Sequence, residues 1–167
     1  MRAAPYVWNY EEIRPSLMET ATLITAEEAE RRVLILENPS LKGETAACDS
    51  MFAGFQLIMP GEVAPTHRHS PAALRFIVEG DGAYTAINGE KAPMKPGDLI
   101  LTPSGVWHDH GNEGTTPVVW LDGLDIPLIR FLGTMFTELY EDGGTHPEGR
   151  PAFDNMARFG ANMRPMD

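Results

Sequence analysis

The feature that most constrains this 167-residue sequence is a central series of short β segments divided by turn residues. Asn88-Gly89 is the clearest turn, because both residues accept positive φ and together favour a type I′ hairpin. Evenly spaced short strands are typical of an antiparallel sandwich or barrel. We therefore expect an all-β domain over residues 51–127. Its predicted strands are Phe52 to Met59, Leu74 to Glu79, Ala83 to Ile87, Glu90 to Met94, Leu99 to Thr102 and Pro117 to Leu124.

Residues 1–50 are expected to form helices and a lead-in strand that pack on this domain. Asn9 with Glu12 predicts the capping box of a helix that ends near residue 23, and Thr25 with Glu28 predicts one or two further turns. The apolar run at residues 33–36 then predicts a buried strand.

Residues 128–167 are expected to be a short helix followed by a linker-like tail. The pattern at residues 128–140 favours a helix weakly, because Gly133 lowers its helix propensity. Residues 141–167 are rich in Gly, Pro, Asn and Met without periodicity, which predicts an irregular segment.

The net charge of the chain limits the classes of partner that it can bind. The net charge is −11 without a cluster of Lys or Arg, which argues against nucleic acid and anionic membrane surfaces. No apolar run reaches the roughly 18 residues of a membrane span, and the N-terminus lacks the apolar core of a secretory signal. We therefore expect a cytoplasmic protein. A small anionic substrate remains compatible, because a few buried arginines can set a local positive field.

The histidines predict a metal site. His67 and His69 are two positions apart, so on a strand both imidazoles point to one face. His108 lies beyond the hairpin, where an antiparallel meander can return it opposite the pair. We expect these three to bind one ion per chain. His146, in the tail, is expected to be exposed.

Two motifs surround the three histidines. The first, GEVAPTHRH, runs from Gly61 to His69, and the second, GDLILTPSGVWHDHGN, runs from Gly97 to Asn112. These segments resemble the two conserved motifs of the cupin superfamily, over roughly residues 52–124. The resemblance implies an all-β fold, the double-stranded β-helix or jelly-roll barrel, with the metal inside.

One departure from the cupin pattern is informative. Most metal-binding cupins carry a glutamate in the first motif, about four residues after the second histidine, whereas Ser70 to Arg75 contains no carboxylate. Three neutral imidazoles leave the charge of a divalent ion uncompensated. Such a site favours anionic, chelating ligands at its open positions.

Longer runs resemble gentisate 1,2-dioxygenase and the related salicylate and 1-hydroxy-2-naphthoate dioxygenases. The resemblance implies Fe(II), and O₂-dependent ring opening between the carboxyl- and hydroxyl-bearing carbons of a small aromatic hydroxy acid. For gentisate (2,5-dihydroxybenzoate) the product would be maleylpyruvate. The sequence leaves open which acid is used, and whether the metal is iron, manganese, nickel or zinc. The runs are residues 30–39, 67–80, 107–112 and 121–127.

The resemblance also implies roles around the metal. Arg75 would hold the substrate carboxylate or an oxygen intermediate, the alternative being a structural salt bridge. His110 would act in acid–base chemistry near the substrate hydroxyl, the alternative being a structural hydrogen bond. Of Arg31 and Arg32, Arg31 is favoured as a substrate anchor, although a surface charge is an equal alternative.

The resemblance also bears on the substrate pocket, on alternative functions and on the number of barrels. Phe52 and Gly54 occupy positions that line the aromatic pocket in related enzymes, although Phe52 would serve equally as a core residue. Other functions on the same barrel are an isomerase or decarboxylase, which Arg75 and the missing glutamate argue against, and a non-catalytic cupin that binds an aromatic acid. The family usually has two barrels, so we expect half of a bicupin whose apolar face drives a homodimer or higher homo-oligomer.

Overall fold

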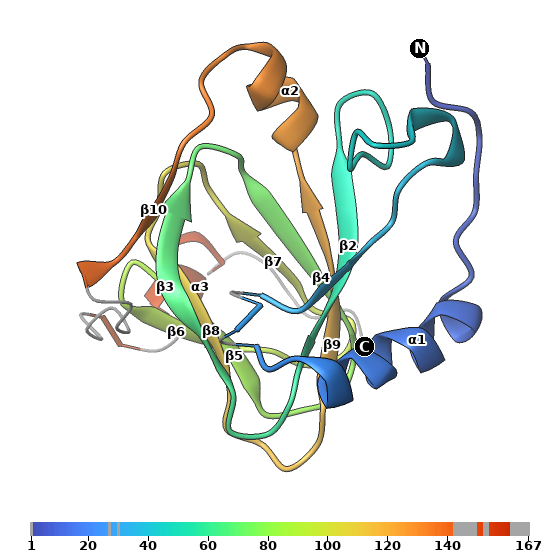
Figure 1. Ribbon diagram of the computed structural model, residues 1–167. Coiled ribbons are helices and arrows are strands. Elements are labelled where there is room, and N and C mark those ends of the chain that lie inside the picture. The colour runs from blue at the N-terminus through green and yellow to red at the C-terminus, as the bar shows by residue number, and fades with distance from the viewer. Residues whose placement is uncertain (1, 27, 30, 142–149, 152–153, 161–167) are drawn as a thin grey trace.

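Two five-stranded antiparallel sheets face each other in the computed structural model (Figure 1). The structure describes the chain except residues 1, 27, 30, 142–149, 152–153 and 161–167. The first sheet has the order β1 (Val33–Ile35), β2 (Phe52–Ile58), β9 (Val118–Leu124), β4 (Ala73–Glu79) and β7 (Leu99–Thr102). The second has the order β10 (Thr137–Leu139), β3 (Val63–His69), β8 (His108–Asn112), β5 (Ala83–Ile87) and β6 (Glu90–Pro93). The helices are α1 (Tyr10–Leu23), the short 3₁₀ helix η1 (Pro39–Leu41), α2 (Ile126–Phe131) and α3 (Asp154–Phe159).

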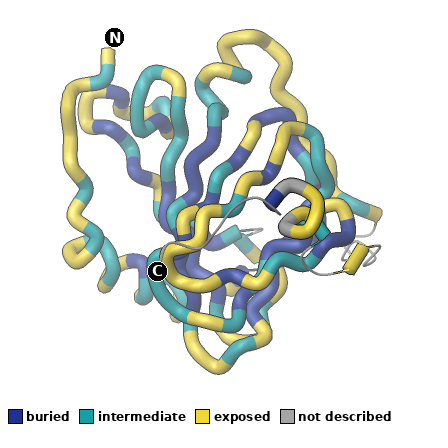
Figure 2. The backbone as a smooth tube through the Cα atoms, turned by 180° about the vertical axis from the view of Figure 1, so that it is seen from behind, coloured by how far each residue is buried: buried dark blue, intermediate teal, exposed yellow. Residues whose placement is uncertain are grey.

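Alternating side chains divide the core into two parts, as the period of a β-strand requires. One cluster lies between the sheets, and the other lies between the first sheet and α1. Buried residues run along the strands, whereas many of the connecting loops are exposed (Figure 2). The inner cluster contains Ile58, Ile77, Ala83, Met94, Val118 and Trp120. The outer cluster contains Leu17, Leu36, Phe55, Leu57 and Val119. Even positions of β2 and β9 therefore face the barrel interior.

The predicted strands and hairpin are confirmed. Asn88 has φ 47° and Gly89 has φ 79°, so both residues adopt the left-handed conformation that a type I′ turn needs. The turn joins β5 to β6, with Ile87 opposite Glu90. The all-β fold is thus established, while the division into residues 1–50, 51–127 and 128–167 stays a prediction.

The N-terminal capping boxes are present in modified form. Asn9 caps α1 by accepting a hydrogen bond from the backbone N–H of Glu11 at 3.1 Å. Thr25 and Glu28 cap each other reciprocally, each backbone N–H donating to the other side chain at 3.1 Å. Only a turn follows Thr25 in the described residues. The predicted strand at residues 33–36 exists as β1, but it is not fully buried, since Ile35 is 43% exposed.

The predicted helix over residues 128–140 is wrong in its second half. Helix α2 ends at Phe131, close to Gly133 with φ 68°, and the chain then forms β10 beside β3. Pairing with an otherwise open sheet edge outweighs a weak helix propensity. Helix α3 likewise lies inside the predicted irregular tail, whereas His146 lies outside the described residues. None of the helices in the described part is long and apolar enough to span a membrane.

Candidate metal centre

Three imidazoles converge between the sheets. His67 and His69 lie on β3, and His108 opens β8 opposite His67. One ring nitrogen from each of the three lies within 4.8 Å of the others. A register shift between Ala64 and His67 marks a bulge in β3, a feature that commonly re-aims side chains at functional sites. The structure therefore brings together the three residues that the sequence predicted as ligands.

The second nitrogen of each ring fixes its orientation. Each Nδ1 lies 2.8–2.9 Å from a backbone carbonyl oxygen two residues away. A carbonyl only accepts, so Nδ1 carries the proton and Nε2 keeps its lone pair. All three Nε2 atoms are buried and lack a hydrogen-bond partner. Metal-binding histidines are typically held in this way, so the donor set fits a divalent cation. The pairs are His67 with Pro65, His69 with Pro71 and His108 with Val106.

Burial and nearby cations keep these imidazoles neutral. Desolvation, with a smaller contribution from the charge of Arg31, lowers the pKa of His67 to about 3. Burial also lowers the pKa of His69 and His108. Neutral imidazole is the form that binds metal. Since Ser70 to Arg75 supplies no carboxylate, positive charge at this centre would be balanced by an incoming anion.

Arg75 lies inside the barrel on β4 and is 1% exposed. Its Nη1 donates to Thr102 Oγ1 at 2.6 Å, and its Nε lies 3.3 Å from Asp122 Oδ1 on the neighbouring strand β9. Burial raises the pKa of Asp122, while the charge of Arg75 opposes that rise. The structural ion pair therefore exists. The same guanidinium lowers the pKa of His108, which shows that its charge acts at the metal centre.

Asp122 and Thr102 were not predicted as site residues. The signal for Asp122 was present, because it is the only charged residue in the strand VVWLDGL and shares the inward face of Trp120. A single charged side chain on the buried face of a strand requires an ion-pair or hydrogen-bond partner.

His110 lies beside the three candidate ligands and is fully buried. Its Nδ1 lies 2.9 Å from Thr85 Oγ1, and its ring centroid lies 5.6 Å from that of His108. The predicted alternative, a structural hydrogen bond, is therefore present at one nitrogen. Its buried Nε2 has no hydrogen-bond partner.

Arg31 and Arg32 lie in different environments in the structure. Arg32 is buried and forms an ion pair with Glu62 at 2.5 Å. Arg31 is half-buried, and its charge lowers the pKa of His67 and of His69. Of these two neighbouring arginines, Arg31 is thus the one whose charge acts at the candidate metal centre, as that of Arg75 does.

The comparisons agree with this geometry. A model of the cupin domain matches residues 54–124, which run from the third residue of β2 to the end of β9 and include the three histidines. The barrel has the cupin fold. The whole chain is 53% identical to gentisate 1,2 dioxygenase 1 of Aquipseudomonas alcaligenes, over 98% of this chain and 47% of that protein. It is 44% identical to the 1-hydroxy-2-naphthoate 1,2-dioxygenase of Nocardioides sp. (strain KP7), over 83% of this chain and 36% of that protein.

A solved structure shares both the cupin fold and the sequence resemblance. The salicylate 1,2-dioxygenase of Pseudaminobacter salicylatoxidans has a TM-score of 0.87 and 36% identity, over 99% of this chain and 47% of that one. The chain therefore spans about half the length, or less, of these relatives. The predicted resemblance to gentisate, salicylate and naphthoate dioxygenases is confirmed.

Gly54 leaves no room for a side chain in the cupin interior. A Cβ there would lie 2.6 Å from Val33 Cγ1 and 3.3 Å from the ring of Phe52. Even the smallest substitution would therefore move Val33, while the pocket-lining role of Gly54 and Phe52 stays a prediction.

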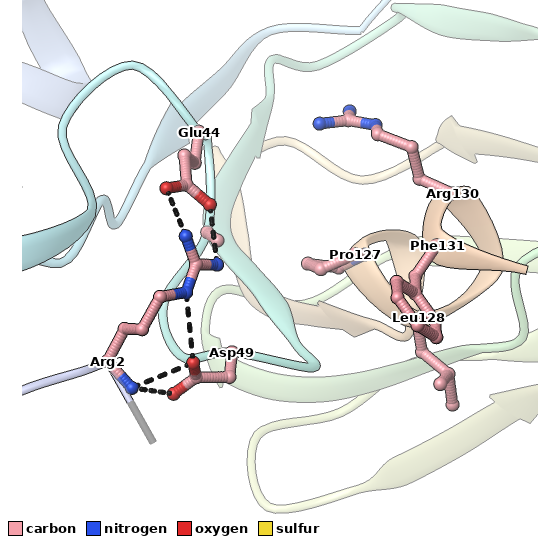
Figure 3. Close-up of a pocket in the computed structure, with 8 residues that line it drawn as sticks. Arg2, Glu44, Asp49, Pro127, Leu128, Arg130 and Phe131 are labelled. Carbon is pink, nitrogen blue, oxygen red and sulfur yellow. Dashed lines mark hydrogen bonds and ion pairs between the residues drawn. The ribbon is translucent and has the colours of Figure 1, made fainter.

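A separate cavity of about 330 Å³ lies away from the histidines, between the N-terminal arm and α2 (Figure 3). Arg2 on one side is neutralised by Glu44 at 2.8 Å and by Asp49 at 3.5 Å. Arg130 and Phe131 lie on the other side. These exposed ion pairs tie the arm to the loop before β2 and do not reach the cupin interior.

Proposed function

We propose that this cupin domain carries the iron(II) centre of a dioxygenase that opens the ring of gentisate. The observation that carries the proposal is a set of three buried imidazoles with free Nε2 atoms, placed within the field of two arginines. The 53% identity to a protein named gentisate 1,2 dioxygenase supports the same chemistry. Bound iron(II) would accept the chelating substrate and supply the O₂ chemistry.

The residues of the chain would orient the substrate and balance its charge. His67, His69 and His108 would hold the metal through their Nε2 atoms, which are buried and have no hydrogen-bond partner. Arg75 and Arg31 would attract the substrate carboxylate, for which a guanidinium fork is well shaped. The bond between the carboxyl- and hydroxyl-bearing carbons would break, and both atoms of O₂ would enter the product, maleylpyruvate.

His110 would manage the proton of the substrate hydroxyl. Its Nε2 is buried, has no hydrogen-bond partner and lies beside the ligand His108. When Nδ1 donates to Thr85 Oγ1, Nε2 carries a lone pair that can accept a proton from a phenol. The hydrogen bond to Thr85 thus fixes the orientation of the His110 ring and leaves Nε2 available as a proton acceptor.

Salicylate is the second candidate substrate. The salicylate 1,2-dioxygenase of Pseudaminobacter salicylatoxidans shares the fold with a TM-score of 0.87, and a structure of that enzyme has been solved with gentisate adducts. One relative of the group therefore accommodates gentisate beside the substrate in its name.

Substrate-dependent oxygen uptake tests the proposal. The chain is reconstituted anaerobically with iron(II) and mixed with gentisate, salicylate or 1-hydroxy-2-naphthoate, and O₂ consumption and loss of ring absorbance are recorded. We expect the fastest uptake with gentisate and none from the zinc-loaded control. Tight binding without uptake would instead identify a non-catalytic aromatic-acid-binding cupin. Fastest uptake with salicylate would establish the second candidate.

A further inference from the structure

Arg32 is a buried cation held by one carboxylate. Its side chain is 3% exposed, and both of its terminal nitrogens lie within hydrogen-bond distance of the two oxygens of Glu62, at 2.5–3.3 Å. Its Nε has no partner. A buried ion pair loses much stability when one partner is removed, because the other charge stays uncompensated.

The backbone places Arg32 and Arg31 on opposite faces of the first sheet. The carbonyl of Arg32 accepts from the backbone N–H of Leu57 at 3.1 Å, so Arg32 extends the β1–β2 pairing and lies opposite Leu57. The Leu57 side chain belongs to the cluster under α1. Paired residues point to the same face and successive residues to opposite faces, so Arg31 faces the barrel interior.

The effect of the Arg31 charge on nearby titratable groups agrees with a side chain that faces the barrel interior. The charge of Arg31 lowers the pKa of His67, and it also lowers the pKa of His110 and Asp122. All three residues point into the barrel from β3, β8 and β9. Arg31 thus contributes positive charge to the same interior as Arg75, although it stands before β1, outside the regular strand.

Glu62 holds the segment that carries Arg31 at two points. Besides Arg32, it accepts from the backbone N–H of Ala26 at 3.4 Å, so its contacts lie before and after Arg31 in sequence. It also accepts from the backbone N–H of Met59 at 2.7 Å, which fixes the carboxylate to the turn between β2 and β3. One side chain therefore ties the lead-in segment to the barrel.

We propose that the Arg32–Glu62 pair positions Arg31 to bind the carboxylate of an aromatic hydroxy acid at the metal centre. This inference rests on the proposed function. The physical reason is preorganisation, since a long side chain on a loose segment would have to be ordered at each binding event. Neither Arg32 nor Glu62 would touch the substrate, so both act through Arg31.

A double-mutant cycle tests the coupling. Calorimetry under anaerobic conditions measures the Kd for gentisate of the iron(II)-loaded chain and of Arg31→Met, Glu62→Gln and the double variant, each with its metal content. We expect Arg31→Met to weaken binding roughly ten- to hundredfold, the loss typical of one charge-assisted contact. Glu62→Gln should weaken it about three- to tenfold in the wild type and have no further effect in the Arg31→Met background.

Two additional variants test whether general destabilisation of the fold could explain a loss of gentisate affinity. Arg32→Lys keeps the charge but loses the two-pronged contact, and it should reproduce a smaller part of the Glu62→Gln effect. Glu79→Gln breaks the Arg14–Glu79 pair of 2.8 Å, which joins α1 to the barrel. That control should lower the thermal midpoint without changing the Kd for gentisate.

The outcomes distinguish this inference from the proposed function. A strong Arg31→Met effect with unchanged binding in Glu62→Gln and Arg32→Lys would overturn the positioning role alone. Two other results would also overturn the positioning role. One is an equal loss of gentisate affinity from Glu62→Gln in the wild-type and Arg31→Met backgrounds. The other is a loss of gentisate affinity in Glu79→Gln as large as that in Glu62→Gln. A wild-type chain that holds iron(II) and does not bind gentisate would overturn both.

Discussion

Each candidate ligand uses its two ring nitrogens differently. In His67, His69 and His108, Nδ1 is fixed by a backbone carbonyl two residues away, while Nε2 points into the shared space. The backbone of β3 and β8 thereby sets the tautomer as well as the direction of each ring. Three ligands prepared in this way reduce the ordering needed when the ion binds.

The first prediction concerns stoichiometry. We expect about one iron(II) per chain in the wild type, as three imidazoles at one centre imply. His108→Ala should abolish stoichiometric binding, because two imidazoles remain. His110→Gln is the matched control, since it changes a neighbouring buried histidine outside the ligand set and should keep the metal. Elemental analysis after desalting measures both. A full equivalent in His108→Ala would show that the ligand assignment is wrong.

The second prediction concerns acid stability of the metal-free protein. The pKa of His67 in the folded chain is about 3, below its ordinary 6.5, because of burial. As the pH falls below 6.5, the unfolded chain binds a proton that the folded chain excludes, so stability decreases towards pH 3. The loss is at most about 1.4 kcal/mol per pH unit for each such histidine. Urea unfolding between about pH 7 and 5 measures it, and His67→Gln should give a shallower slope. An unchanged slope would contradict the assignment.

The third prediction concerns Arg75. Arg75→Ala should keep the metal and lose about tenfold or more in kcat/KM for gentisate, because a charge-assisted contact is worth roughly 1.5–3 kcal/mol. It should also lower stability, since Asp122 loses its ion-pair partner. Arg14→Ala, which removes the α1 ion pair to Glu79, serves as the control for stability. Near-normal kcat/KM in Arg75→Ala would leave Arg75 with a structural role only.

Strand β10 carries none of the candidate ligands, but it lies beside β3, which carries two of them. It pairs with β3 so that Thr137 lies opposite His69 and Leu139 lies opposite His67. The Arg68–Glu138 ion pair joins the two strands, and the Arg68 guanidinium lies 4.6 Å above the Trp107 ring. Strand β10 thus covers the outer edge of the strand that carries two ligands.

The fourth prediction tests whether this edge strand supports the ligands. Glu138 lies opposite Arg68 in the ladder, between the backbone hydrogen bonds from Ser70 to Phe136 and from Tyr140 to Thr66. The alternating pattern of an antiparallel pair therefore makes Glu138 a hydrogen-bonded position. Glu138→Pro removes that donor and should loosen β3. We expect iron(II) affinity, measured by competition with a chelator, to fall about tenfold, a typical loss when ligand support is removed.

Glu138→Gln separates the backbone effect from the exposed ion pair. It keeps the ladder and removes only the charge, which is worth about 0–1 kcal/mol at an exposed site. Its metal affinity should stay close to that of the wild type. Equal affinity in the proline and glutamine variants would contradict a supporting role for β10.

Local patterns predicted the elements that local interactions determine. Short β segments between turn residues predicted the strands, Asn88-Gly89 predicted the hairpin, and the two-residue spacing of His67 and His69 predicted a pair of metal ligands. The structural features that the sequence analysis missed depend on contacts between segments that are distant in sequence. The strand at Thr137–Leu139 has no period of its own and exists because the edge of β3 is open to pairing. The partnership of Asp122 with Arg75 likewise requires knowing that β9 lies beside β4.

At the scale of the whole molecule, the first sheet presents an apolar outer face at its edge. Leu74 lies opposite Leu101 and Phe76 lies opposite Leu99, so all four side chains share one face. Phe76, Leu99 and Leu101 are 43%, 60% and 63% exposed. An apolar cavity of about 370 Å³ adjoins them, lined in part by Leu74, Leu101 and Pro103. Strand β7 ends the sheet, so its outer backbone groups face no partner strand in the described chain.

The fifth prediction follows from this face. We propose that two copies associate through β7 and the four apolar side chains around a two-fold axis, since an open apolar sheet edge readily pairs with its own copy. Light scattering at micromolar concentration should give the mass of a dimer or a higher oligomer. Leu101→Lys should shift the mass towards the monomer, because the substitution would bury two like charges at the contact. Phe131→Lys, at an 86% exposed position on α2, should leave the mass unchanged. A monomeric wild type would rule the association out, and an equal effect of both substitutions would place the contact elsewhere.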